Sequence, residues 1–521
     1  MKSRFRLASS LWVILLVAAA LRLVAAFLST GYLMHDDHFL VLEAAGSWRD
    51  GEDYNLWFPW NQEAAGVPIG PHPANFAYVG TQYLFLLALD AAGITDPADL
   101  AFIIRLLHGL YSLLIPWLGW KMARQMGGES AASIVGWSLA ALAWMPLLSV
   151  HQLVEMVCIP PMMFAFWTLL KVPRQEWAIR HLLLAGAWLG LATGLRYQLG
   201  ILAVGWAVAL LWDESGKRNV RYFQELIPLA LGAIVIFSLT QIADLWVWGE
   251  PFVQLRAYFG YNTTHATAYP QGPWYQYFLT LAGLLIPPVS LAWMYGTGKS
   301  TRKWLWVALP ILFFFAFHSI YSNKQERFIL PIVPMIILLG TLGWQEFMSQ
   351  KSPDSAWWKW QRWGLRFALS INVLGLIFLT PAAFKTARVT AMEILFRRGD
   401  LENFVAVEVD SASMPPRFYS GEWSPYYAHS MAANPANEKK VMCRNTARPF
   451  PNYLLFYGDE RIAGRVEEYK QVYTTMEYIG QAAPGKWDRL LAWLNPINQA
   501  ERVMIYRINP AVECPVRYAF H

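Results

Sequence analysis

Residues 11–28 read LWVILLVAAALRLVAAFL, and the polar stretch after them contains MHDDHF at residues 34–39. The first stretch is an apolar run of roughly 18 residues, which is long enough to cross a bilayer as a helix. The second contains two adjacent carboxylates, Asp36 and Asp37, between two histidines. We therefore expect a membrane helix that carries the acidic pair to the membrane–water interface, which makes the pair the first candidate for chemistry.

The bulk composition is that of a membrane protein. The chain has 521 residues, of which 56% are hydrophobic and 15% are charged, whereas a soluble protein carries about 25% charged residues. The 27 Trp and 24 Tyr suit aromatic belts at the membrane interfaces. We attribute the net charge of +6 to basic cytoplasmic loops, because no RNA-binding motif or basic block is present. The lipid bilayer is an expected partner, and nucleic acid is not.

Apolar segments recur along most of the chain. They lie at residues 10–28, 76–92, 101–120, 131–147, 152–170, 181–212, 224–243, 275–295, 303–321, 328–346 and 365–384. Segment 181–212 is too long for one span and is interrupted at Arg196. If it is a broken hairpin with Arg196 at its tip, and 76–92 does not fully cross, the short basic loops all lie inside. This topology predicts about eleven crossings, as does the alternative in which 76–92 crosses and 181–212 is one span.

The composition changes after the last apolar segment. Residues 385–521 mix charged residues, Pro and Asn with strand-like runs at 403–409 and 502–507. We expect a polytopic α-helical membrane domain over residues 1–384, followed by a small mixed α/β soluble domain over residues 385–521 on the outer face.

The chain has three cysteines. Cys158 lies in an apolar segment, whereas Cys443 and Cys514 both lie in the polar tail. In an oxidising compartment the two tail cysteines can form a disulfide, and two unpaired thiols fit the sequence equally well.

The first outer loop, residues 29–75, is acidic. Apolar residues recur at every third position, at Phe39, Leu42 and Ala45. This spacing predicts an amphipathic helix on the membrane surface, and a carboxylate at its start can act as a general base. In the structural alternative, Asp36 caps the helix and Asp37 lies in its first turn. A divalent cation held by both, with His35 or His38, is less favoured, because a hard ion requires more oxygen ligands. No cofactor is predicted.

Three basic residues are candidates for binding an anion. Arg196 interrupts an apolar segment, where an arginine needs an anionic or carbonyl partner, and its guanidinium matches phosphate oxygens. Lys324 and Arg327 lie on the expected outer face, against the positive-inside trend. The alternatives are an Arg196 that reaches to interfacial water and a Glu326 that neutralises one of the other two.

The third outer loop, residues 244–273, combines polar and aromatic side chains. They include Arg256, Asn262 and His265, and Trp274 follows directly. Aromatic rings beside polar groups suit a sugar or a lipid headgroup, and an ordinary interfacial belt has the same composition. By charge bias alone this loop, the first loop, Arg196 and residues 322–327 face one side of the membrane.

Three of these stretches together resemble the lipid-linked-sugar mannosyltransferases of the GT-C superfamily, which include the GPI mannosyltransferases and the dolichol-phosphate-mannose-dependent α-mannosyltransferases. The matching stretches are residues 34–39 with Glu43, YPQGPW at 269–274 and NKQERFILPIVP at 323–334. SGEWSPYYAH at 420–429 is a weaker match to the tail of that family.

The resemblance implies a GT-C fold and an inverting glycosyltransferase. A sugar, most often mannose, would move from a polyprenyl-phosphate donor to a hydroxyl of a glycolipid or glycan acceptor. Asp36 would be the general base, with Asp37 assisting, and Arg196, Lys324 and Arg327 would bind the donor phosphate. The remaining candidates would bind substrate: Glu43, Arg256, Asn262, His265, Trp274 and Glu326.

Two other functions are compatible with the sequence. A transporter or flippase of a lipid-linked sugar also places charges in the membrane, but such proteins are usually built from repeated halves, and no repeat is present. The other is a GT-C enzyme that modifies lipid A or protein. We expect a bacterial inner membrane with a periplasmic site, because Ala519-Phe520-His521 is no retrieval signal; the endoplasmic reticulum, with a lumenal site, is the alternative.

Overall fold

The computed structural model describes residues 10–212, 216–408, 414–430, 432–458, 462–495, 498 and 500–515. It divides into two compact units. Unit 1 comprises residues 1–27, 56–80 and 105–381, and unit 2 comprises residues 28–55, 81–104 and 382–521. The division near residue 382 lies close to the expected domain boundary, but part of the first outer loop groups with the tail.

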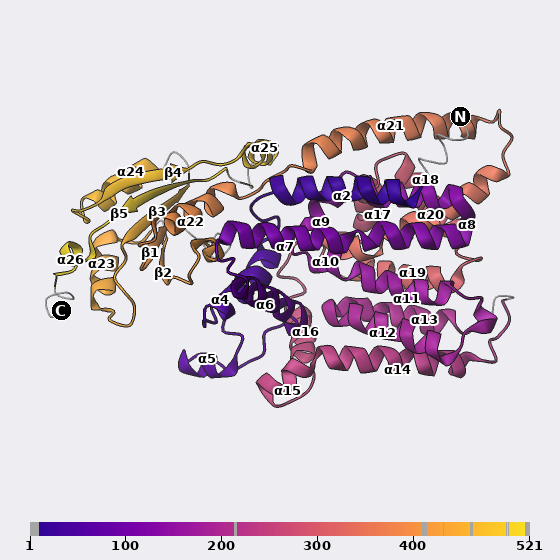
Figure 1. The fold of residues 1–521 in the computed structure, drawn as a ribbon, viewed down its shortest axis with the longest axis horizontal. Helices are drawn as coiled ribbons and strands as arrows, with labels where there is room; N and C mark the ends of the chain where they lie inside the picture. The colour runs from indigo at the N-terminus through magenta and orange to yellow at the C-terminus, as the bar shows by residue number, and fades with distance from the viewer. Residues whose placement is uncertain are drawn as a thin grey trace. The chain divides into compact units, whose positions relative to one another are not determined.

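Unit 1 is a helical bundle whose longer helices run roughly side by side in Figure 1. Its helices are α2 (Leu11–Leu28), α5 (Pro59–Ala64), α8 (Leu114–Ala141), α9 (Met145–Val150), α10 (Val154–Val157), α11 (Ile159–Leu170), α12 (Ile179–Leu195), α13 (Ile201–Ala209), α14 (Tyr222–Thr240), α15 (Ile242–Trp248), α16 (Val253–Thr264), α17 (Gln276–Leu284), α18 (Val289–Ser300), α19 (Leu305–Ile320), α20 (Val333–Ser349) and α21 (Ala356–Leu379). Helices α6 (Phe76–Ala91) and α7 (Pro97–Ser112) have residues in both units.

The described residues contain five helices that are long and apolar enough to cross a membrane. A sixth span results if α17 and α18, which are bent by 120° at their junction, are counted as one. Five shorter apolar helices accompany them. The polytopic helical fold is as expected, whereas the count of about eleven crossings stays a prediction.

Two interruptions shape the bundle. Arg196 has an extended backbone between the end of α12 and a 3-10 turn at Tyr197–Gly200, after which α13 begins, so the long apolar run is broken where the sequence predicts. Gly128 interrupts α8 with a φ of 79°. The two arms of α8 pack against each other at Gly119. A Cβ at that position would lie 2.2 Å from Leu139 Cδ1.

Glycines bring α12 and α14 into backbone contact. A Cβ on Gly186 would lie 1.9 Å from the carbonyl oxygen of Leu229, and one on Gly190 would lie 2.3 Å from that of Ala233. Small residues spaced by four allow such close approach between membrane helices, where dispersion and not the hydrophobic effect drives packing.

We expect Gly190→Ala to destabilise the protein by about 1–3 kcal/mol, because its methyl group must displace a backbone carbonyl. Gly283→Ala in α17 is the matched control, since a Cβ there meets nothing within 4 Å and alanine favours a helix by up to about 1 kcal/mol. Thermal unfolding of the detergent-purified proteins measures both, and equal melting temperatures would contradict the packing argument.

Unit 2 contains a five-stranded sheet of order β2-β1-β3-β5-β4. The strands are β1 (Phe404–Val407), β2 (Tyr426–His429), β3 (Tyr453–Gly458), β4 (Glu477–Ala482) and β5 (Arg502–Arg507). β1 is parallel to β2 and β3, and β5 is antiparallel to β3 and β4. The strand-like runs at 403–409 and 502–507 are confirmed as β1 and β5. The mixed α/β character of the tail is confirmed as well.

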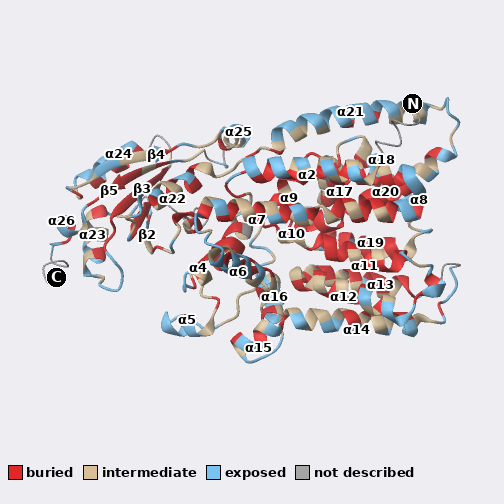
Figure 2. Ribbon diagram, in the orientation of Figure 1, coloured by how far each residue is buried: buried red, intermediate tan, exposed pale blue. Residues whose placement is uncertain are grey.

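The helices of unit 2 are α3 (His35–Asp37), a π-helix η1 (His38–Glu43), α4 (Ala44–Arg49), α22 (Thr386–Arg398), α23 (Pro435–Arg444), α24 (Ile462–Lys470), α25 (Lys486–Leu494) and α26 (Pro510–Glu513). The central strands β1 and β3 are buried, as Figure 2 shows. Their side chains form a core with α24, in which Leu454, Phe456 and Tyr469 are fully buried.

Cys443 and Cys514 form a disulfide with their Cα atoms 5.8 Å apart. It joins α23 to the residue after α26 and closes a separation of 71 residues. A loop of this length implies a stabilisation of roughly 4 kcal/mol through the unfolded chain. We expect reductant to lower the melting temperature of unit 2 in the wild type and to leave a Cys443→Ser/Cys514→Ser variant unchanged. Three free thiols in the untreated wild type, counted by mass spectrometry, would contradict the pairing, which leaves only the thiol of Cys158 free.

Candidate functional site

The acidic stretch forms the start of a helix in unit 2. α3 begins at His35, and its N-cap is Met34 without a capping side chain. Asp36 therefore lies in the first turn and does not cap the helix, which contradicts the structural alternative for this residue. Asp36 is half-buried, and the side chain of Asp37 lies outside the described part of the chain.

The helix continues as η1 and α4, and its residues from 38 to 47 are buried apart from Leu40. Glu43 is 1% exposed, and its Oε1 lies 3.0 Å from His38 Nε2. His38 stacks on Tyr32 at 4.5 Å between ring centroids. The expected amphipathic helix on the membrane surface does not describe this segment, because its polar side chains bond to each other inside unit 2.

Residues 417–423 of the tail cover this helix. The backbone N–H of Phe418 donates to both carboxylate oxygens of Glu43, at 3.0 and 3.2 Å. Arg49 Nη2 donates to the carbonyl of Gly421 at 2.7 Å. The Arg417 guanidinium lies 4.1 Å from the Trp423 ring centroid, and burial lowers the pKa of Arg417 while Glu43 opposes that effect. Gly421, in the weaker matching stretch, thus contacts the helix that contains the acidic stretch and Glu43.

A second charged cluster lies in unit 1, where Glu155 pairs with two arginines. Arg196 Nη1 lies 2.6 Å from Glu155 Oε1, and Arg327 Nε lies 3.5 Å from the same oxygen. Glu155 is 2% exposed. Arg196 Nε and Nη2 and Glu155 Oε2 are buried without a hydrogen-bond partner among the described residues. Sequence reasoning missed Glu155, although an acid within the apolar segment 152–170 already requires a partner.

Lys324 lies beside this cluster in the turn before η4 (Glu326–Ile332). Its ammonium donates to the carbonyls of His318 and Ser319 at 2.8 and 2.9 Å and to that of Tyr321, which uses all three of its donors. The same ammonium lies 5.3 Å from the Tyr277 ring centroid.

The third outer loop meets this turn. Lys324 N donates to Pro270 O at 3.0 Å, and Tyr321 Oη donates to Asn262 O at 2.7 Å. The structure therefore brings three of the four expected polar stretches together within unit 1: the Arg196 break, the loop 244–273 and the turn 322–327.

The other substrate-binding candidates are spread over the loop and the turn. Arg256 is exposed and pairs with Glu250 at 2.6 Å. His265 stacks on Tyr261 at 4.4 Å. Trp274 and Glu326 are exposed. The roles expected for these residues, and for Glu43 and Asn262, stay predictions.

The described residues contain no group of three or more His, Cys, Asp or Glu side chains that could hold a metal ion.

Comparison with known proteins gives three findings. The sequence profile of the Alg9-like mannosyltransferase family matches residues 12–403. Mannosyltransferase APTG1 of Arabidopsis thaliana is 24% identical over 368 residues, which are 66% of this chain and 60% of that protein. The chain thus spans about three fifths of the length of this relative.

Two solved structures share the fold. ArnT from Cupriavidus metallidurans, in the apo state, has a TM-score of 0.58 at 12% sequence identity. The superposition covers 96% of this chain and 98% of the ArnT chain. The oligosaccharyltransferase of Archaeoglobus fulgidus has a TM-score of 0.52 at 10% sequence identity. The superposition covers 90% of this chain and 72% of the oligosaccharyltransferase chain. At such identities the likeness shows a common fold.

Proposed function

Because this chain belongs to the Alg9-like mannosyltransferase family, we propose that it is a membrane glycosyltransferase that moves mannose from a polyprenyl-phosphate donor to a glycolipid or oligosaccharide hydroxyl. The similar APTG1 is named a mannosyltransferase, and ArnT has also been solved bound to undecaprenyl phosphate, in a structure with a TM-score of 0.55. The first supports mannose as the sugar, and the second supports a lipid-linked donor.

The observation that carries the proposal is the pair of unpartnered donors on Arg196. Burying an N–H donor without an acceptor costs about 1–3 kcal/mol, so a largely buried guanidinium with two such donors is suited to an anion from outside the chain. Its planar fork matches phosphate oxygens. Glu155 occupies Nη1 and orients the remaining donors, while Arg327 adds positive charge beside it.

The proposed reaction is a single displacement at the anomeric carbon. The acceptor oxygen forms its bond to that carbon as the bond to the phosphate oxygen breaks, so the configuration inverts. Asp36 takes the proton of the attacking hydroxyl. The leaving lipid phosphate gains negative charge, and Arg196 with Arg327 stabilises it. Glu43 and His38 follow Asp36 in the chain and are hydrogen-bonded to each other. This bond holds the first loop in place.

We place the reaction on the outer face of the membrane. The disulfide between Cys443 and Cys514 suits an oxidising compartment, which is the periplasm for a bacterial inner membrane and the lumen for the endoplasmic reticulum. The periplasmic face is our preferred location.

The experiment incubates purified full-length protein with labelled polyprenyl-phosphate-mannose and a membrane lipid extract. We expect labelled glycolipid whose anomeric configuration is opposite to that of the donor, as determined with α- and β-specific mannosidases. GDP-mannose is the control donor and should give no product. Transfer from GDP-mannose alone, or retention of configuration, would overturn the proposal. Movement of the lipid-linked sugar between leaflets without transfer would favour a flippase.

A further inference from the structure

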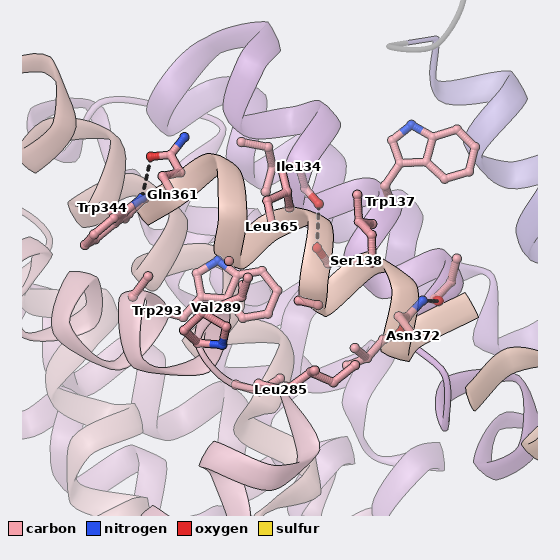
Figure 3. Close-up of a pocket in the computed structure, with 18 of the residues that line it drawn as sticks. Ile134, Trp137, Ser138, Leu285, Val289, Trp293, Trp344, Gln361, Leu365 and Asn372 are labelled. Carbon is pink, nitrogen blue, oxygen red and sulfur yellow. Dashed lines mark hydrogen bonds between the residues drawn. The ribbon is translucent and has the colours of Figure 1, made fainter. Parts of the chain in front are cut away.

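A hollow of about 330 Å³ lies within unit 1 between α8, α18, α20 and α21. Its wall is mostly aromatic and aliphatic, with Trp137, Trp293, Trp344 and Trp360 from four elements of the bundle. Figure 3 shows several of these side chains around the opening. The volume is in the range of small-ligand pockets, which run from about 300 to 1,000 Å³.

The polar groups in the wall are already bonded within the chain. Asn372 donates to Ala141 O at 2.7 Å and accepts from Ala143 N at 2.8 Å. Gln361 accepts from Trp344 Nε1 at 2.9 Å, as the dashed line in Figure 3 marks. Ser138 donates to Ile134 O at 2.8 Å. The hollow therefore offers hydrocarbon surface to a ligand and suits an acyl chain better than a polar molecule.

One wall of the hollow is a helix with few other contacts. Only Gly364 and Ala368 of α21 are buried, and the residues that line the hollow, such as Gln361, Leu365 and Asn372, form one stripe at helical spacing. Another wall is the junction of α17 and α18, where the chain bends by 120°.

The flank of α21 beside this stripe is basic. Arg362 and Arg366 each follow a lining residue, Gln361 and Leu365, and so lie about 100° further around the helix. Both are exposed, no ion pair joins either to a described acidic residue, and α21 contains no Asp or Glu. α21 is long and apolar enough to cross a membrane, where an arginine needs a partner or access to water, and the guanidinium matches the oxygens of a lipid phosphate.

We propose that this hollow binds one anionic phospholipid, with an acyl chain between α8, α18, α20 and α21 and its phosphate at Arg362 and Arg366. The site is separate from the cluster of Glu155, Arg196 and Arg327. Arg327 precedes α20, whereas Trp344 lies about 17 Å further along that helix. The bound lipid ties α21 to the rest of unit 1 and makes binding depend on the headgroup charge.

The test is native mass spectrometry of delipidated full-length protein titrated with phosphatidylglycerol and with phosphatidylcholine of identical chains. We expect one tightly bound phosphatidylglycerol, and roughly 10- to 30-fold weaker binding in Arg362→Gln/Arg366→Gln, because each basic residue contributes to anionic-lipid attraction. Ala368→Phe fills the hollow and should abolish the tight site. Lys440→Gln in α23 is the control, since Lys440 is an exposed cation of unit 2, and its binding should match the wild type.

Three results would overturn the proposal. The first is equal affinity of the wild type for the two lipids. The second is undiminished binding in the double arginine variant, whose exposed positions do not threaten folding. The third is displacement of the phospholipid by an equimolar amount of undecaprenyl phosphate, which would assign the hollow to the donor's own chain.

Discussion

Asp36→Asn is expected to lower kcat/KM for sugar transfer by about 10²- to 10⁴-fold, the range that general-base catalysis contributes. Asparagine keeps the size of the side chain and cannot accept the hydroxyl proton. Because Asp36 does not cap its helix, the substitution removes no helix-capping bond, and a thermal melt of the variant checks that it stays folded. Initial rates with labelled polyprenyl-phosphate-mannose provide the measurement.

Two companion variants make this result specific. Glu52→Gln neutralises an exposed carboxylate of the same unit and should leave the rate unchanged. Asp37→Asn should cause a smaller loss than Asp36→Asn. If Asp37→Asn alone abolishes transfer, the base is the second carboxylate of the pair, and the family assignment is unaffected.

Arg196→Gln is expected to reduce kcat/KM by about 10²- to 10³-fold, the usual effect of removing one donor that stabilises charge on a reacting group. It also leaves the carboxylate of Glu155 buried with a weaker partner. Breaking a buried ion pair from one side costs about 3–5 kcal/mol, so the melting temperature should fall as well.

A second substitution separates these two effects. Glu155→Gln in the Arg196→Gln background removes the uncompensated charge, and we expect it to restore most of the lost stability without restoring transfer. Melting temperatures and the KM for the donor are measured on the same preparations. Recovery of activity together with stability would mean that Arg196 serves only as the structural partner of Glu155.

The interruption at Arg196 could be predicted because a charge inside a long apolar run has a recognisable cost. Strands β1 and β5 could be predicted because short runs rich in β-branched and aromatic residues stand out in a polar tail. Glu155 was not found, since its partners Arg196 and Arg327 are 41 and 172 residues away in the chain and local periodicity carries no such information. The burial of residues 38–47 depends on residues 417–421, which cover them from the other end of the sequence.

The bond between Glu43 and the tail comes from the backbone of Phe418 and not from its side chain. Any residue except proline supplies the same N–H, so the donor itself does not depend on which side chain stands at position 418. The number of residues between β1 and Phe418 must stay fixed, because an insertion or deletion there would bring a different backbone amide to Glu43. Chimaeras that exchange the soluble tail between related enzymes should therefore be joined so that this spacing is kept.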